Sequence, residues 1–128
     1  MEPAHLTLLA GWIALLGGAA SGALIGLRFH REQWLGGYGS FRRRLMRLGH
    51  IAFFGLGFIN LLFSFSIRVL PVPEPFGEVA AVGLVVGAVT MPLTCFLAAW
   101  RAPLRQLFPL PVTAVIGAIV SLLAGWSS

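Results

Sequence analysis

The chain has 128 residues, of which 58% are hydrophobic and only 10% are charged, and its mean hydropathy is +0.90. Soluble domains carry about 25% charged residues, so this composition excludes an ordinary soluble protein. A net charge of +5 would point to nucleic acid in a soluble chain. Here the charges flank apolar stretches, so we expect lipid and other membrane chains as partners and no nucleic acid.

Four long apolar stretches carry almost no internal charge. Each has roughly the 20 residues that a helix rising about 1.5 Å per residue needs to cross the hydrocarbon core of a bilayer. We expect the whole chain, residues 1–128, to form a single all-α transmembrane domain, an antiparallel four-helix bundle. The predicted spans are residues 6–27, 48–67, 79–100 and 108–126.

The arginines are distributed unequally between the two ends of these stretches. Eight of the nine lie in the segment 28–47 or in the connection that follows Trp100. Because short cytoplasmic loops are enriched in Lys and Arg, we expect 28–47 to be a cytoplasmic loop and both termini to lie on the non-cytoplasmic side. This places the chain in the inner (cytoplasmic) membrane of a bacterium as a multi-pass protein.

The basic segment 28–47 also contains a predicted helix start. Ser40 is a plausible N-cap, and the helix that enters the second span would then begin at Phe41. Clustered arginines at a cytoplasmic surface gain roughly 1 kcal/mol each from an anionic leaflet. We therefore expect contacts with anionic lipid headgroups from Arg42, Arg43, Arg44 and Arg47.

Small residues recur on one face of several spans, as is typical of helices that approach each other closely in a membrane. Internal packing and contact with another subunit or copy both explain these faces. The residues concerned are Gly18, Gly22 and Gly26 in the first span, Gly83 and Gly87 in the third, and Ala114, Gly117 and Ala118 in the fourth.

A polar stripe runs along the second span. At 100° per residue its members fall within an arc of about 140°, and polar groups at membrane depth need protein or water partners. One interpretation is hydrogen bonding between helices, and the other is a surface that faces a ligand, cofactor or partner. The stripe comprises Arg43, Arg47, His50, Gly57, Asn60, Ser64 and Arg68.

Two histidines are predicted near the same membrane surface, His30 after the first span and His50 at the start of the second. Neutral imidazoles from two facing helices can ligate a b-type haem. Histidines at a membrane edge also have structural or headgroup-contacting roles. We expect no cofactor and no metal, and keep haem b at His30 and His50 as the alternative.

No nucleophile has an evident base and orienting group, so we expect no enzymatic activity. The favoured hypothesis is a non-catalytic accessory or structural subunit of a larger bacterial inner-membrane complex, with respiratory or other electron-transfer assemblies as first candidates. One alternative is the haem-binding electron-transfer subunit. The other is a small homo-oligomeric transporter or channel that uses Asn60 and Ser64.

Overall fold

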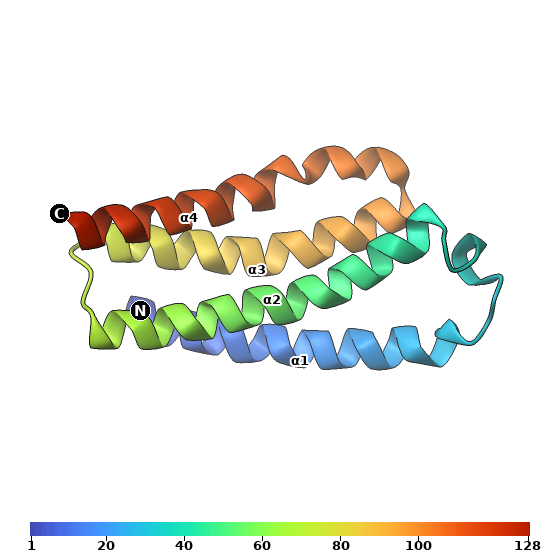
Figure 1. Cartoon of the computed structure of the whole chain (residues 1–128), viewed down its shortest axis with the longest axis horizontal. Coiled ribbons are helices and arrows are strands. Elements are labelled where there is room, and N and C mark those ends of the chain that lie inside the picture. The colour runs from blue at the N-terminus through green and yellow to red at the C-terminus, as the bar shows by residue number, and fades with distance from the viewer.

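The computed structural model describes all 128 residues, and it contains helices and no strands. Four helices are long and apolar enough to cross a membrane, which is the form of a multi-pass membrane protein. They are α1 (Pro3–Phe29), α2 (Phe41–Val69), α3 (Phe76–Trp100) and α4 (Pro109–Ser127), with short 3₁₀ segments η1 (Trp34–Gly36) and η2 (Ala102–Leu107) in two of the connections (Figure 1).

The helices begin where the local chemistry of the sequence favours a helix start. The Ser40 side chain accepts a hydrogen bond of 3.1 Å from the backbone N–H of Arg43, which confirms Ser40 as the N-cap of α2. Prolines stand in the first turn of α1 and of α4, where the missing N–H leaves no hydrogen bond unmade. The helices α1, α2 and α3 begin before the apolar spans predicted from sequence, whereas α4 begins at Pro109, one residue after its predicted start.

Consecutive helices run in opposite directions, and both termini lie at the same end of the molecule (Figure 1). Each helix packs on the next, and α1 also reaches α3. In contrast, α4 runs beside α3 and has no extensive contact with α1. In an apolar 18-residue stretch of each helix, 11% of the residues are buried in α4, against 44% in α3. The four apolar helices therefore fit a transmembrane bundle, but one that is open at α4.

Glycines set the closest approaches between helices. A Cβ added to Gly11 of α1 would lie 2.9 Å from the carbonyl oxygen of Gly57 in α2. A Cβ added to Gly83 of α3 would lie 2.8 Å from the carbonyl oxygen of Ala114 in α4. Larger residues at either position would push the helix backbones apart. The small residues thus bring the helices together where there is little hydrophobic gain from helix association in lipid.

Candidate functional site: the polar face of α2 and the surface of α4

The polar residues deepest in α2 face neighbouring helices. Asn60 and Ser64 are fully buried. The Ser64 hydroxyl donates a 2.6 Å hydrogen bond to the carbonyl of Ala4 in α1. The Asn60 amide donates to its own helix at Leu56 (2.9 Å) and across to Leu84 of α3 (3.2 Å). These contacts tie α1, α2 and α3 together, so this part of the stripe joins helices within the chain.

The glycine face of α1 holds the imidazole of His50. Its Nδ1 atom lies 2.9 Å from the carbonyl oxygen of Gly18 and 3.3 Å from the hydroxyl of Ser21. The Phe54 ring meets the imidazole edge-on, with ring centroids 5.3 Å apart. A Cβ at Gly22 would lie only 2.5 Å from Cε1 of His50. The absence of side chains at Gly18 and Gly22 therefore creates the space that His50 and Phe54 fill.

The other predicted packing glycines divide into two kinds. Gly57 packs against Gly11 of α1, and Gly83 and Gly87 pack against α4. A Cβ at Gly87 would collide with the side chain of Val115. Gly26 differs, because no atom lies within 4 Å of the position its Cβ would take. Gly26 thus shares the regular spacing of Gly18 and Gly22 but not their close contact with α2.

Arg43 differs from the other arginines for which lipid contact was predicted, because its side chain is buried within the chain. Arg43 is fully buried, and its guanidinium donates to the carbonyls of Phe29 (3.0 Å), Arg31 (2.7 Å) and Glu32 (3.4 Å). Carbonyls beyond the end of a helix have no partner within the helix. Arg43 of α2 supplies a hydrogen-bond donor to these carbonyls and thereby holds the segment after α1 in place.

Aromatic rings enclose the same guanidinium. Its carbon lies 4.2 Å from the ring centroid of Tyr38, 4.9 Å from that of Phe29 and 5.3 Å from that of Trp34. Cation–π attraction is strongest for such a desolvated cation. The Nε atom has no hydrogen-bond partner. Arg43 is therefore the centre of a folded cap over the basic end of α1 and α2.

The other arginines of the cluster remain at the surface. Arg42, Arg44 and Arg47 are exposed. Arg42 donates from Nε to the carbonyl of Ala99 near the end of α3 (2.8 Å), and Arg47 donates to the carbonyl of Tyr38 (3.3 Å). Their charges face outward, so the contact with anionic lipid predicted for these three residues stays a prediction.

The structure does not bring His30 and His50 together as a ligand pair. His30 is exposed at the C-cap of α1. His50 packs beside Gly22 of α1. Gly22 precedes His30 by eight residues, which is about 12 Å along the axis of α1. The Nε2 atom of His50 would lie 3.2 Å from a Cβ at Gly22, which leaves no gap for a macrocycle between this ring and α1. No group of three or more His, Cys, Asp or Glu side chains is placed to hold a metal ion.

A groove on the surface between α3 and α4 was not predicted from sequence. Its volume is about 530 Å³, and half of the eight residues that line it are Gly or Ala. Gly117 of α4 is exposed there, with no atom within 4 Å of its Cβ position. The lining residues are Glu78, Val79, Val82, Gly83, Thr113, Ala114, Gly117 and Ala118.

The small-residue face of the fourth span was the sequence signal for this groove. Periodicity showed that Ala114, Gly117 and Ala118 share one side of a helix. It did not show that α3 covers Ala118 and leaves Gly117 open.

Comparison of the chain with family models, with curated proteins and with solved structures gives no match. Function must therefore be inferred from the helices and their surfaces.

Proposed function

We propose that the protein is a non-catalytic accessory subunit of a larger bacterial inner-membrane complex, and that the groove between α3 and α4 binds a helix of another subunit. The observation that supports this proposal is the exposure of α4. This helix is the least buried of the four, and its exposed side carries an open, small-residue groove next to α3.

The chemistry of this groove suits a helix. Small side chains allow two backbones to approach closely, and packing of this kind is a main source of helix association in lipid. The one hydroxyl in the groove, that of Thr113, already donates to the Pro109 carbonyl of its own helix (2.7 Å). An apolar partner helix would therefore leave this hydroxyl hydrogen-bonded, and the one charged group that lines the groove is the Glu78 carboxylate in the first turn of α3.

The deep polar side chains of the chain support a structural role. Asn60 and Ser64 join α2 to α3 and α1, and His50 contacts the backbone of α1. These groups stabilise the chain's own helices and leave α4 as the free surface. Haem binding and transport remain the alternative functions.

The proposed orientation puts both termini on the non-cytoplasmic side. The exposed Arg42, Arg44 and Arg47 lie at the opposite end from the termini, as cytoplasmic arginines would (Figure 1). In this arrangement the groove opens sideways into the bilayer, where a second subunit would meet it. Electron-transfer assemblies are the first class of complex in which to look for the partner.

The test is isolation of the tagged protein from native membranes in mild detergent, followed by mass spectrometry and an absorption spectrum of the same sample. We expect other membrane chains in fixed stoichiometry with the wild type. Gly117→Leu should reduce their recovery at least tenfold, because leucine fills the open groove and its Cβ has no atom of the chain within 4 Å.

The matched control is Gly55→Leu, since Gly55 of α2 is also exposed with no atom within 4 Å of its Cβ position but lies outside the groove. This variant should retain the partners. A wild-type protein that is recovered alone, or equal loss of partners in both variants, would contradict the proposal. A haem absorption band belonging to this chain would revive the cytochrome alternative.

A further inference from the structure

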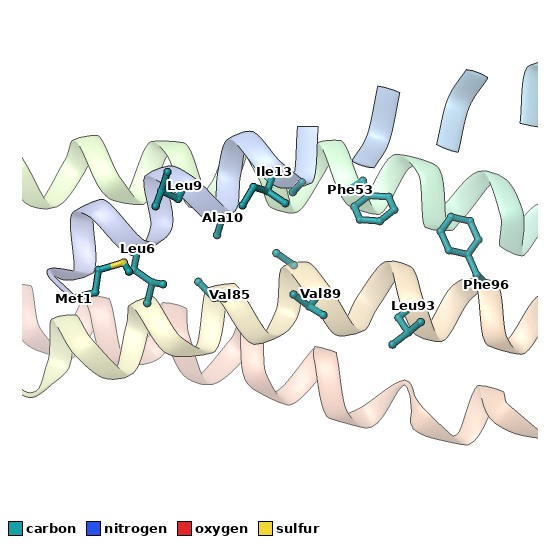
Figure 2. Close-up of a pocket in the computed structure, with 12 residues that line it drawn as sticks. Met1, Leu6, Leu9, Ala10, Ile13, Phe53, Val85, Val89, Leu93 and Phe96 are labelled. Atoms are coloured by element: carbon teal, nitrogen blue, oxygen red, sulfur yellow. The ribbon is translucent and has the colours of Figure 1, made fainter. Parts of the chain in front are cut away.

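A different groove lies between α1 and α3, on the side of the chain away from α4. Its volume is about 540 Å³, and all twelve residues that line it are hydrophobic. Figure 2 shows Leu6 and Ala10 of α1 on one side of this groove and Val85 and Val89 of α3 on the other. The volume lies within the range of about 300–1,000 Å³ that is usual for ligand pockets.

Two aromatic rings close one end of the groove. They belong to Phe53 of α2 and Phe96 of α3, and their centroids are 6.1 Å apart (Figure 2). Met1 lies at the other end, beside the start of α1. The groove therefore begins at the end of the molecule that carries the chain termini and stops inside the helical part.

The groove is long, because it follows both α1 and α3. On α1 it runs from Leu6 to Ala14, about 12 Å, and on α3 from Val85 to Phe96, about 17 Å, at about 1.5 Å per residue. The two stretches are offset along the bundle, since Val85 lies level with Ala10 and Phe96 lies beyond Phe53 (Figure 2). The groove is therefore longer than either stretch, and its closed end lies past the middle of the helices, because Phe96 is four residues from the end of α3.

The width and lining of the groove select the kind of ligand. A volume of about 540 Å³ spread over a length of at least about 17 Å corresponds to a mean cross-section of at most about 30 Å², which is much narrower than a helix of about 10 Å diameter. Ligands with polar groups need a few placed polar partners in the pocket, and the lining supplies no polar side chain. These facts favour a single hydrocarbon chain.

We propose that this groove is a structural lipid site, which binds one acyl chain of a phospholipid from the leaflet that surrounds the termini. The headgroup stays at the surface near Met1, and the end of the acyl chain lies against Phe53 and Phe96. The site is separate from the groove at Gly117. Its occupation therefore does not depend on the proposed partner.

The test is native mass spectrometry of the protein released from detergent micelles after incubation with one defined phosphatidylethanolamine. The wild type should retain one lipid per chain. Ala10→Phe places a ring in the groove and should lower the retained fraction at least tenfold, whereas Ala19→Phe, at an exposed position of α1 outside the groove, should leave it unchanged.

Val89→Phe gives the same test from the opposite wall, at a position that is 60% exposed and tolerates a larger side chain. Loss of the lipid in both groove variants supports the proposal. No lipid on the wild type, or equal retention in all variants, would overturn it. A bound isoprenoid quinone from native membranes in place of phospholipid, or a dimer that both groove variants abolish, would also overturn it.

Discussion

The three-helix unit α1–α2–α3 and the helix α4 are held in place by different chemistry. Within the unit, deep side chains make hydrogen bonds between helices, as Ser64 does to α1 and Asn60 does to α3. The polar contacts of α4 lie near the end where the termini meet, from Ser121 to the carbonyl of Phe76 and from Trp126 to that of Leu70. Elsewhere α4 rests on α3 through small and apolar residues such as Ala118.

Because of this difference, the three-helix unit determines the stability of the chain, while α4 is the part that is available to bind another helix. A helix fixed by buried polar groups has one favourable position, because displacement leaves those groups unpaired in lipid. A helix held through small apolar residues can exchange lipid for another helix at little cost. Substitutions in the three-helix unit should therefore change stability, while substitutions on the open side of α4 should change association.

The largest expected effect is that of Arg43→Ala. Removal of the buried guanidinium leaves the carbonyls of Phe29, Arg31 and Glu32 without this donor. A hydrogen bond to a charged group contributes about 1.5–3 kcal/mol and a desolvated cation–π contact about 2 kcal/mol, together about 3.5–5 kcal/mol. The free energy of unfolding in a denaturant titration in micelles should fall by about this amount. The exposed Arg44→Ala should change it by less than about 0.5 kcal/mol, and equal effects of the two variants would refute the buried cap.

Gly22→Leu should come next. The new side chain would displace the His50 ring from its contact with α1, and overpacking of this kind costs about 1–3 kcal/mol. Gly26→Leu is the matched control, since it lies one turn further along the same face with open space around it. The same titration should show a loss for Gly22→Leu alone. A similar loss in the control would mean that general helix effects explain the result.

A smaller effect is expected for Ser64→Ala, which removes the hydrogen bond to Ala4. Hydrogen bonds between membrane helices contribute about 0.6 kcal/mol on average and at most about 1.7 kcal/mol. The variant should lose stability within this range in the same titration. Ser66→Ala, two residues away on α2 and only half-buried, serves as the reference. No difference between the two serines would weaken the assignment of Ser64 as a link between α1 and α2.

The smallest effect on stability is expected for Gly117→Leu. Because no atom lies within 4 Å of the Cβ position, the free energy of unfolding of the isolated chain should change by less than about 0.5 kcal/mol. The same substitution should remove partner chains from the native complex. A variant that unfolds the chain would show that this face of α4 is internal and would erase the contrast between α4 and the three-helix unit.

The sequence predicted the number and type of helices because length and apolarity alone set what can cross a bilayer. It also predicted the α2 N-cap, since Ser40 precedes a long periodic segment. Periodicity gives the face of a helix on which a residue lies, but not the neighbour that covers this face. Gly22 and Gly26 illustrate the limit, because only Gly22 is opposite a side chain of α2.

The surroundings of Arg43 were beyond the reach of the sequence for a related reason. Four arginines stand within six positions at the start of α2. The sequence of this cluster does not distinguish an arginine in water from one among headgroups or one in a buried cap. The fold of the segment after α1 decides which of them is enclosed. The grooves beside α3 could not be predicted either, since they depend on how far α1 and α4 stand from that helix.

The most direct test of the proposed docking surface is photo-crosslinking in native membranes from a photoreactive residue at position 117, with position 55 as the control. The account predicts that position 117 yields a covalent product with one defined membrane protein, while position 55 yields lipid adducts. Lipid adducts alone at both positions, or a covalent dimer of this chain from position 117, would contradict the assignment of this protein as an accessory subunit that docks through α4.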